Sequence, residues 1–285
     1  MKPVADPFAA TSWTLAHGRS LELGPASVIM GILNVTPDSF SDGGRFADPA
    51  RALDRALQLA QEGAAIVDIG GESTRPGATP VDARTEMDRV LPVIAALAGR
   101  SDVAISIDTW RAQTARAAIA AGAHIVNDVW GLQRDPDMAD AIAGSGAGCV
   151  LMHTGRERRR DDDVFADQQS FLSKSLELAA AAGIAASAIV LDPGFGFAKE
   201  TRENLRLLAG FERLAGFGRP LLAGTSRKRF IGAVTGRDEG GRDIGTVATN
   251  VVARLKGAAV FRVHDVAAHR DALAMADAIL TAGRP

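Results

Sequence analysis

Several features that would define a class of protein are absent from this sequence or scarce in it. The 285 residues include a single cysteine, which excludes an internal disulfide framework and is typical of a reducing compartment, so we expect a cytoplasmic protein. The formal net charge is only −2, which argues against binding nucleic acid through bulk charge. No apolar run approaches the ~20 residues of a membrane helix, and the first residues show no apolar signal-peptide core.

Aromatic residues are also scarce, at 5 %, and tyrosine is absent, whereas glycine is abundant. The 30 glycines exceed the usual ~7 % of a chain, which predicts many tight turns. Hydrophobic residues make up 47 % and charged residues 23 %, proportions that exclude intrinsic disorder. The length suits an α/β barrel, which takes about 250 residues as one domain.

Short apolar runs rich in valine, isoleucine and leucine alternate with longer amphipathic, alanine-rich stretches. This pattern predicts a parallel sheet covered by helices. The expected strands are 28–33, 65–69, 103–107, 124–127, 148–152, 188–191, 220–223 and 259–262. The expected helices are 48–61, 82–97, 111–121, 135–143, 164–182, 203–214, 243–256 and 266–281. Eight units in unbroken alternation favour a closed TIM (β/α)8 barrel over an open sheet.

A different pattern precedes the first of these units. Residues 12–23 are expected to form a short hairpin that turns at His17 and Gly18 and plugs the bottom of the barrel. No composition change suggests a linker or a second globular domain. We therefore divide the chain into an N-terminal extension with a hairpin over 1–25 and a single barrel domain over 26–283.

Barrel active sites lie where the strands end and the following loops begin, and polar residues gather at these points in the sequence. They are Asn34, Glu72, Ser73, Thr74, Arg75, Asp108, Asn127, Asp128, His153, Asp192, Ser226, Arg227, Lys228, Arg262 and His264. A single serine, threonine, aspartate or asparagine at a strand end also serves as an ordinary helix cap. The complete ring of polar residues nevertheless predicts a functional site.

Four cationic side chains in this ring predict an anionic ligand. Arg75 lies in a loop rich in glycine, proline, serine and threonine, where a guanidinium can bind phosphate oxygens, or can simply be solvated. Arg262 and His264 are two residues apart, so they point the same way from one strand. Lys228 lies near the start of an expected helix, where backbone N–H groups favour anions. The expected ligand class is a phosphorylated or diphosphorylated small molecule.

Two carboxylates and an amide form a second group at the strand ends. Asp108, Asn127 and Asp192 match the donor and acceptor edges of a flat heterocycle with amino, N–H and carbonyl groups. The alternative is a metal site made of Asp108, Asp192 and His264. It is weaker, because the sequence has no His-x-His or His-Glu-x-x-His spacing.

Two further features suggest ordinary structural roles. Arg158, Arg159 and Arg160 are followed by three aspartates, so a solvated loop is expected there rather than a nucleic-acid patch. Cys149 lies in an apolar strand without an activating basic neighbour and is expected in the core.

An ordered set of motifs is similar to the dihydropteroate synthase family of pterin-binding barrel enzymes, over nearly the whole chain from about Val28. The motifs are MGILNVTPDSFSDGG (30–44), GGESTRPGA (70–78), SIDT (106–109), VNDV (126–129), DPGFGF (192–197), TSRK (225–228) and RVHD (262–265). This family joins 4-aminobenzoate to a hydroxymethyl-dihydropterin diphosphate in folate biosynthesis and releases diphosphate, with Mg²⁺ required. The resemblance also implies a homodimer and competition by sulfonamides, which mimic aminobenzoate.

The resemblance further implies a role for each matching residue. The pterin would contact Asp108, Asn127, Met152, Asp192, Lys228 and Arg262. The diphosphate would contact Asn34, Thr74, Arg75, Arg262 and His264. The aminobenzoate would contact Thr74, Pro76, Phe197, Ser226 and Lys228. Asp108, Lys228, Arg262 and His264 would take part in catalysis, and Asn34 would meet Mg²⁺.

The chain departs from the family pattern at two points. The family commonly continues with Met-Gln-Gly after the histidine that corresponds to His153, whereas here Thr154, Gly155 and Arg156 follow. Ala198 replaces a frequent glycine. The first departure is expected to alter the rim of the pocket, and the second to alter a loop beside the aminobenzoate site. Two alternative functions remain at this point, a catalytically silent pterin-binding paralogue and a pterin-dependent methyltransferase domain.

Overall fold

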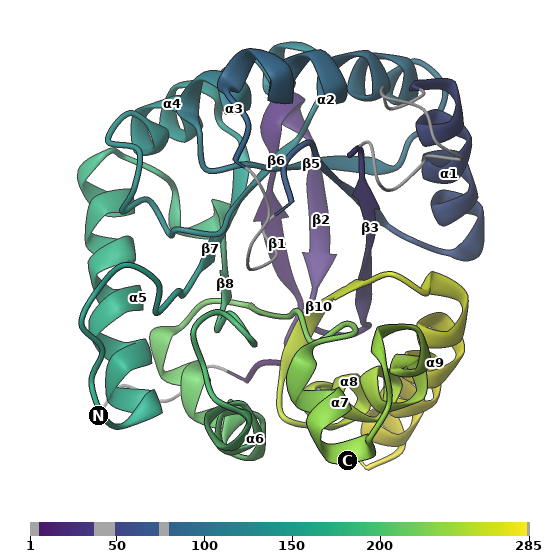
Figure 1. Cartoon of the computed structure of the whole chain (residues 1–285), viewed down its shortest axis with the longest axis vertical. Helices are drawn as coiled ribbons and strands as arrows, with labels where there is room; N and C mark the ends of the chain where they lie inside the picture. The colour runs from purple at the N-terminus through teal and green to yellow at the C-terminus, as the bar shows by residue number, and fades with distance from the viewer. Residues whose placement is uncertain (1–5, 37–48, 74–79, 284–285) are drawn as a thin grey trace.

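The computed structural model of the chain describes residues 6–36, 49–73 and 80–283. Eight parallel strands close into a barrel in the order β10-β3-β4-β5-β6-β7-β8-β9, and helices surround it (Figure 1). The barrel confirms the predicted fold class. A two-stranded antiparallel sheet precedes it in the chain.

The strands lie close to the expected ranges. The hairpin consists of β1 (Thr11–Thr14) and β2 (Ser20–Leu23). The barrel strands are β3 (Val28–Asn34), β4 (Ile66–Gly70), β5 (Ala104–Asp108), β6 (Ile125–Asp128), β7 (Gly148–Met152), β8 (Ile189–Asp192), β9 (Leu221–Ala223) and β10 (Ala258–Val263). Six of them extend one residue further than expected, usually to include the polar residue at the carboxyl end.

Each barrel strand in the described part of the chain is followed by a helix. The helices are α1 (Pro49–Glu62), α2 (Ala83–Ala98), α3 (Ala112–Ala120), α4 (Met138–Ser145), α5 (Val164–Ala181), α6 (Thr201–Ala209), α7 (Arg229–Thr235), α8 (Asp243–Leu255) and α9 (Val266–Ala282). Short 3₁₀ turns are η1 (Ala16–Gly18), η3 (Ala186–Ala188), η4 (Phe211–Phe217) and η5 (Glu239–Gly241). Asp48, the expected cap of α1, lies outside the described residues.

Two expected helices differ from the structure. The range 203–214 was wrong as one helix, because α6 ends at Ala209 and η4 follows. Gly210 separates them, and a Cβ there would lie 2.7 Å from the ring of Phe165. Helix α4 begins three residues later than expected, because the Asp135 carboxylate accepts the backbone N–H groups of Ala112 and Asp137 and holds a turn.

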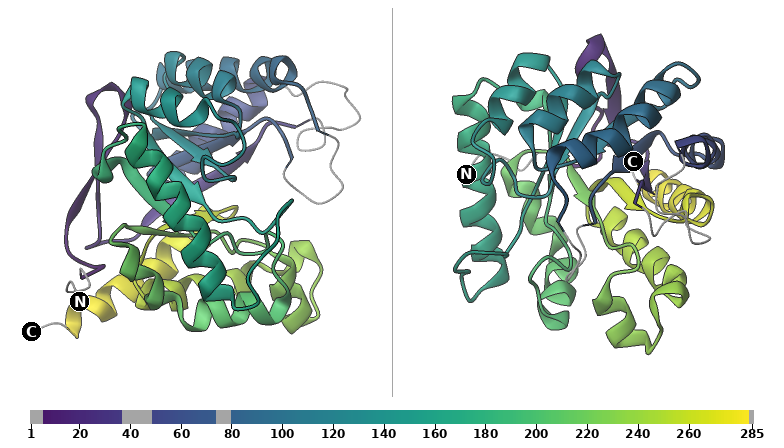
Figure 2. Two further views of the ribbon diagram at one scale, coloured as in Figure 1. Left: turned by 90° about the vertical axis from the view of Figure 1, so that its left-hand side faces the viewer. Right: turned by 45° about the horizontal axis from the view of Figure 1, so that its top comes forward.

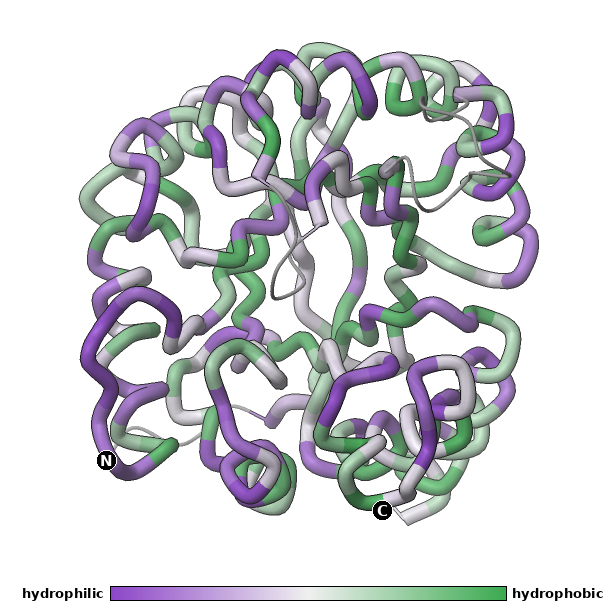
Figure 3. The backbone as a smooth tube through the Cα atoms, viewed as in Figure 1, coloured by the Kyte–Doolittle hydropathy of each residue, from purple (hydrophilic) through white to green (hydrophobic). Residues whose placement is uncertain are grey.

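Alternate residues along each strand face either the helices or the barrel interior. The outward layer packs against the helices, whose polar and apolar stretches alternate along the tube of Figure 3. The inward layer forms a separate core that includes Met30, Ile66, Val150 and Val260. This inner core fills only the part of the barrel toward the amino ends of its strands.

The hairpin closes that end of the barrel, as predicted (left panel of Figure 2). Trp13, Leu15 and Leu23 are buried against the inner core, and Trp13 Nε1 donates to the carbonyl oxygen of Ala188 at 2.9 Å. Gly148 allows this approach, because a Cβ there would lie 2.5 Å from Leu15 Cδ2. The hairpin therefore covers the apolar interior at this end, and the polar residues at the carboxyl ends of the strands lie at the opposite end.

A buried arginine fastens the segment between hairpin and barrel. Arg254 of α8 donates to the carbonyl oxygens of Gly24 and Pro25 and to Asp277 of α9, whose carboxylate also accepts from Ser27. Because carbonyl and carboxylate acceptors surround it, its charge is compensated although the side chain is only 1 % exposed.

Candidate active site

The predicted polar ring assembles at the carboxyl ends of the strands. Asn34 of β3 is in register with Gly70 of β4, Gly70 with Asp108 of β5, and Asp108 with Asn127 of β6. Asp192 ends β8 on the other side of the barrel. Asp108, Asn127 and Asp192 are all buried, so the structure brings together the three residues expected to meet a heterocycle.

Arg262 of β10 lies at the centre of this group and bridges two carboxylates. Its Nε donates to Asp68 Oδ2 at 2.6 Å, and its Nη2 donates to Asp108 Oδ2 at 2.7 Å. Asn127 Nδ2 donates to the same Asp68 oxygen at 3.1 Å. One guanidinium therefore fixes the relative positions of side chains from β4, β5 and, through Asp68, β6.

Asp68 is the one central residue that sequence reasoning missed. It lies inside β4 rather than at its end, so a search of strand ends passes over it. The available signal was its position in the alternation: Ile66 points inward and Val67 and Ile69 point toward the helices, so Asp68 points inward. A carboxylate at an inward position of an otherwise apolar strand requires a buried cation, and Arg262 supplies it.

Burial shifts the proton affinities of the site. It raises the pKa of Asp108, and the neighbouring Asp68 carboxylate acts in the same direction against the pull of Arg262. It raises the pKa of Asp192 as well. Burial and the positive charge of Arg262 lower the pKa of Lys228 to about 8. Burial also disfavours the charge of Arg262, but the two carboxylates prevail and raise its pKa, so it stays protonated.

Lys228 faces the same cavity from the residue that precedes α7, which confirms the predicted helix start. Its Nζ lies 4.3 Å from the centre of the Phe197 ring, within the range of a cation–π contact. Asp192 Oδ1 accepts the backbone N–H of Gly194 at 2.7 Å, which fixes the turn leading to Phe197. The predicted pterin and aminobenzoate residues thus meet at one wall.

The cavity between these side chains is small. Its lining includes all six predicted pterin residues, together with Val129, Gly194, Phe195, Phe197 and Gly224. Its volume is about 20 Å³, which leaves room for about one water molecule. The contact between the Arg262 and Asp108 side chains lies at the centre of this cavity.

The remaining predicted residues lie around the cavity or outside the described part of the chain. Ser226 Oγ lies 2.9 Å from His264 Nδ1 and accepts the His264 backbone N–H at 3.2 Å, so these two residues form a pair. Asn34 Oδ1 and Asp108 Oδ2 lie 3.8 and 3.7 Å from the point where a Cβ of Gly70 would stand, so glycine keeps the space between them open. Thr74, Arg75 and Pro76 lie outside the described residues.

A buried network supports the loop that carries Phe197. Lys199 Nζ donates to His153 Nδ1 at 2.8 Å and to the carbonyl oxygen of Gly194 at 2.8 Å. His153 Nε2 lies 3.0 Å from Asp167 Oδ2 and 3.0 Å from Arg158 Nη2. Burial lowers the pKa of His153 to about 4 and that of Lys199 to about 7. His153 is therefore a structural link to this loop, with no contact to the cavity.

The expectation of a simple solvated loop around Arg158 was wrong. Arg158 donates to both carboxylate oxygens of Asp167, at 2.8 and 2.7 Å, and Arg160 pairs with Glu203 at 3.1 Å. Only Arg159 is exposed among the three arginines. The net charge of the segment could not predict these ion pairs, because it does not show which side chains point inward. Successive side chains of the segment point to opposite sides. Cys149, in contrast, is buried as predicted, and burial raises its pKa.

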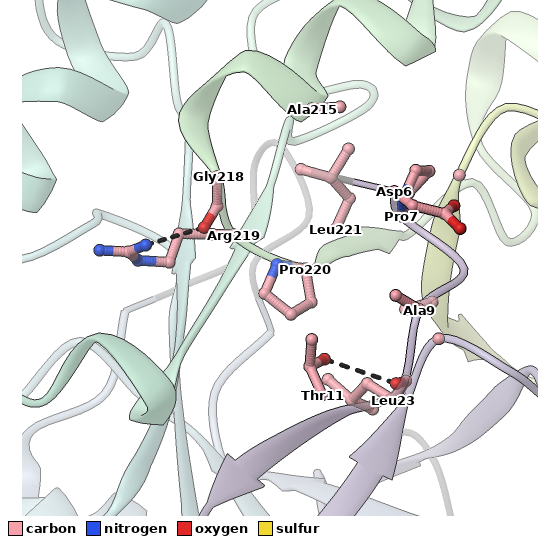
Figure 4. A pocket seen from close by; sticks show the side chains of 13 residues that line it. Asp6, Pro7, Ala9, Thr11, Leu23, Ala215, Gly218, Arg219, Pro220 and Leu221 are labelled. Carbon is pink, nitrogen blue, oxygen red and sulfur yellow. Dashed lines mark hydrogen bonds between the residues drawn. The ribbon is translucent and has the colours of Figure 1, made fainter. Parts of the chain in front are cut away.

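A second cavity lies at the other end of the barrel. It is lined by the segment after Asp6, by Leu23 and Gly24, and by the turn from Gly218 to Leu221 (Figure 4). Its lining is mainly apolar, and the Arg219 side chain points away from it toward the carbonyl oxygen of Gly218. This cavity has none of the convergent polar groups of the first one.

Over 6–36, 49–73 and 80–283, no three histidine, cysteine, aspartate or glutamate side chains are grouped to hold a metal ion. Among the same residues, no helix is both long enough and apolar enough to cross a membrane.

The fold is a closed (β/α)8 barrel, and buried hydrogen-bond donors and acceptors meet at its mouth. This combination is that of a barrel protein that binds a polar ring. The chain belongs to the pterin binding enzyme family, whose model matches residues 30–264.

Known proteins resemble the chain over almost its whole length. The dihydropteroate synthase of Bacillus subtilis is 46 % identical over 257 residues, 90 % of each chain. The Xanthomonas albilineans dihydropteroate synthase with 4-aminobenzoic acid aligns with a TM-score of 0.90 at 45 % identity, over 96 % of this chain and 100 % of that one. The same synthase in complex with 7,8-dihydropteroate aligns with a TM-score of 0.86 at 42 % identity, over 95 % and 100 %.

The paired carboxylates around Arg262 lead to a stability prediction. Replacing Asp68 with alanine leaves Arg262 one carboxylate and removes the acceptor of Asn127. Losing a partner of a buried ion pair costs about 3–5 kcal/mol, and because Asp108 remains, we expect the free energy of unfolding to fall by about 2–3 kcal/mol. Urea denaturation followed by tryptophan fluorescence measures this change. Asp88→Ala, which removes an exposed ion pair on α2, is the control and should cost under about 0.5 kcal/mol. Equal losses in both variants would contradict the assignment.

Proposed function

We propose that the chain catalyses the dihydropteroate synthase reaction of folate biosynthesis. 4-Aminobenzoate and (7,8-dihydropterin-6-yl)methyl diphosphate would give 7,8-dihydropteroate and diphosphate. The observation that carries the proposal is the convergence of Asp108, Asn127, Asp192 and Lys228 on one cavity, in a chain that matches known synthases over nine tenths of its length. The relatives crystallised with 4-aminobenzoic acid and with 7,8-dihydropteroate support the same substrates here.

The cavity suits the polar edge of a pterin. The amino and N–H groups of the ring are donors, and Asp108 and Asp192 supply carboxylate acceptors. Lys228 supplies an ammonium donor for the ring carbonyl, and the Asn127 amide can meet either kind of group. Arg262 Nη2 now pairs with Asp108, so a ring whose N–H groups donate to Asp108 would replace that ion pair with hydrogen bonds and free Arg262 Nη2 to turn toward the diphosphate.

The reaction requires a stabilised leaving group more than a strong base. The amine nitrogen of aminobenzoate forms a bond to the methylene carbon while the carbon–oxygen bond to diphosphate breaks, and the electron pair leaves with the diphosphate. The departing diphosphate or solvent takes up the proton that the amine loses. Arg75, Arg262 and His264 would take up negative charge on the departing group, and the Asp108 carboxylate would stabilise positive charge that develops on the ring. Phe197, Ser226 and Lys228 would hold the aromatic amine, with Thr74 and Pro76 completing its site.

We propose Asn34 as the protein ligand of Mg²⁺. Mg²⁺ usually keeps several waters and takes few protein oxygens beside substrate phosphates, so a single amide oxygen at the mouth fits its preferences. When bound, the ion would neutralise charge on the diphosphate. Thr74 would contact the same diphosphate.

Two substitutions test the catalytic assignments. We expect Asp108→Asn and Arg262→Ala each to lower kcat by about 10²–10³-fold, because each removes a charge that the transition state needs. Diphosphate release is measured with the pterin diphosphate, 4-aminobenzoate and Mg²⁺, and circular dichroism checks folding. Arg270→Ala, an exposed arginine on α9, is the matched control.

The same assay separates the alternatives. Release that depends on aminobenzoate identifies the synthase. Pterin binding without release would identify a silent paralogue, and methyl transfer would identify a methyltransferase domain. Near-wild-type rates in Asp108→Asn or Arg262→Ala would contradict the residue assignments alone.

The lowered pKa of Lys228 predicts a pH dependence. The ammonium form donates a charge-assisted hydrogen bond to the ring carbonyl and the neutral amine only a weaker one, so kcat/KM for the pterin diphosphate should fall as the pH rises through about 8. In Lys228→Arg the cation persists to much higher pH, so this decline should disappear even if the maximal rate is lower. A pH–rate profile of both proteins measures the effect. An unchanged decline in Lys228→Arg would assign it to another group.

We also propose that the chain forms a homodimer through α8 and α9. Ile244, Val252 and Leu255 lie on one stripe of α8 and are 86 %, 39 % and 45 % exposed, and Met275 and Ile279 form an exposed pair on the neighbouring α9. These helices lie side by side (Figure 1). A second copy of the chain can cover this exposed apolar surface. The lone buried thiol suits the reducing cytoplasm in which we propose that the enzyme works.

Sedimentation velocity tests the dimer. The wild-type chain should sediment at twice its 29.7 kDa mass, and Ile244→Glu should shift it toward the monomer. Leu205→Glu changes an exposed leucine of α6, outside this surface, and should leave the dimer intact. A monomeric wild type, or equal effects of the two substitutions, would overturn the interface.

A further inference from the structure

A tight turn from Thr225 to Lys228 carries two of the residues that the proposed reaction uses. The Lys228 backbone N–H donates to the carbonyl oxygen of Thr225 at 3.1 Å, which closes the turn. Ser226 and Lys228 lie on either side of Arg227 in the chain. Among the described residues, Lys228 lines the cavity and Arg227 does not. We call residues 225–228 the lysine turn.

Arg227 has a backbone conformation that usually belongs to glycine. Its φ is +55°, in the left-handed region, where the Cβ of any other residue is crowded. Arg227 is the third residue of the lysine turn, and a positive φ at this position of a tight turn favours glycine. The chain keeps an arginine here at a conformational cost. This choice indicates that the side chain of Arg227 has a role of its own.

The first turn of α8 holds Arg227 by its side chain and by both of its backbone polar groups. The guanidinium donates twice to Asp243, from Nε at 2.8 Å and from Nη2 at 2.9 Å. The Arg227 N–H donates to Thr246 Oγ1 at 3.1 Å, and its carbonyl oxygen accepts from Arg242 Nη1 at 3.0 Å. Because two parallel bonds join the guanidinium to the carboxylate, they fix its orientation as well as its distance.

The first turn of α8 is itself packed closely against α7, which lies beside it (Figure 1). A Cβ on Gly245 of α8 would lie 2.5 Å from Ile231 Cγ2 of α7. On α7, a Cβ on Gly232 would lie 2.5 Å from Arg242 Nε, so glycine leaves the space that this guanidinium fills. Asp243 occupies the first turn of α8, where the helix dipole favours an acidic side chain. The carboxylate that binds the lysine turn is therefore fixed in place.

The two neighbours of Arg227 contact other residues of the candidate site. Ser226 Oγ lies 2.9 Å from His264 Nδ1, and Lys228 Nζ lies 4.3 Å from the centre of the Phe197 ring. Because Arg227 alone separates them in the chain, a change in its φ or ψ would rotate one of these side chains relative to the other. The backbone of Arg227 thus determines whether both can face one substrate.

We propose that the ion pair between Arg227 and Asp243 holds the lysine turn in the orientation that the aminobenzoate site requires. Arg227 and Asp243 are positioning residues, which act on the substrate through Ser226 and Lys228. The ion pair keeps the arginine in a conformation that its Cβ disfavours. This inference rests on the proposed synthase function.

Asp243→Asn tests the proposal at a residue outside the lysine turn. The substitution removes the charge of the partner and keeps its size. We expect KM for 4-aminobenzoate to rise by about three- to tenfold, because Ser226 and Lys228 both face this substrate and lose their fixed orientation. The value of kcat should change by less than about threefold, because Asp108 and Arg262 lie on other strands. Diphosphate release measures both constants.

The pH dependence provides a readout that a general loss of stability would not move. Burial and the charge of Arg262 lower the pKa of Lys228 to about 8. A turn that no longer holds Lys228 in its buried position lets this pKa rise toward its ordinary value. In Asp243→Asn, the decline of kcat/KM for the pterin diphosphate should therefore occur at a higher pH than in the wild type.

Substitutions of Arg227 separate the role of its side chain from that of its backbone. Arg227→Gln loses the ion pair and keeps the crowded conformation, so KM for aminobenzoate should rise and the melting temperature should fall. Arg227→Gly also loses the ion pair but relieves the crowding, so it should regain stability while KM stays raised. Arg227→Lys keeps a charge and should recover part of the affinity. Arg227→Gln combined with Asp243→Asn should raise KM no further than either change alone.

Glu212→Gln is the matched control, because Glu212 pairs with Lys256 at 2.9 Å at the opposite end of α8. It should leave the constants of both substrates unchanged. A wild-type KM in Asp243→Asn or in Arg227→Gly would overturn the proposal. A raised KM in Arg227→Gln alone would show that Arg227 acts without Asp243 and would also overturn it. A wild-type chain that releases no diphosphate would instead overturn the proposed function.

Discussion

Arg262, held between two buried carboxylates, sets the arrangement of the whole mouth. Its Nε meets Asp68 and its Nη2 meets Asp108, so side chains of three strands are tied to one guanidinium. With Asp192 and Lys228, the cavity gathers three acids and two bases. Burial raises the pKa values of Asp108 and Asp192 although Arg262 and Lys228 pull both of them down, and for Asp108 the neighbouring Asp68 carboxylate adds to the rise. A ligand that offers N–H donors to the buried carboxylates supplies the hydrogen bonds that these groups lose on burial.

The two ends of the barrel have different roles: one stabilises the fold, and the other carries the polar site. Apolar residues fill the interior toward the amino ends of the strands, and the hairpin residues Trp13, Leu15 and Leu23 cap them. Arg254 then fastens the chain between hairpin and first barrel strand. Because that end is rigid and apolar, the polar residues at the other end can stay partly unsatisfied. Asp68 Oδ1 and Ser106 Oγ, for example, have no hydrogen-bond partner among the described residues.

The fold could be predicted well from the sequence, because the strands and helices of such a barrel follow local patterns of apolar and polar residues. Apolar runs of strand length and amphipathic stretches of helix length are each visible without knowing what they contact. Asp108, Asn127 and Asp192 followed from the rule that sites lie at strand ends. Asp68 did not, since its role depends on which way an interior residue points and on a partner 194 residues away. Arg158 was misjudged for a related reason, because summed charge says nothing about which side of a segment each side chain occupies. Thr74, Arg75 and Pro76 remain predictions outside the described residues.

The contact between Gly155 and Ala198 has a consequence for exchanging parts between related enzymes. The two positions share one small volume, since a side chain at 155 would press on the Ala198 methyl group. A side chain at 155 would also meet Arg160 Cδ, 2.4 Å from the Cβ position, so glycine at 198 would relieve only part of the crowding. A loop exchanged between related enzymes with a larger residue at 155 therefore needs matching changes at both neighbours.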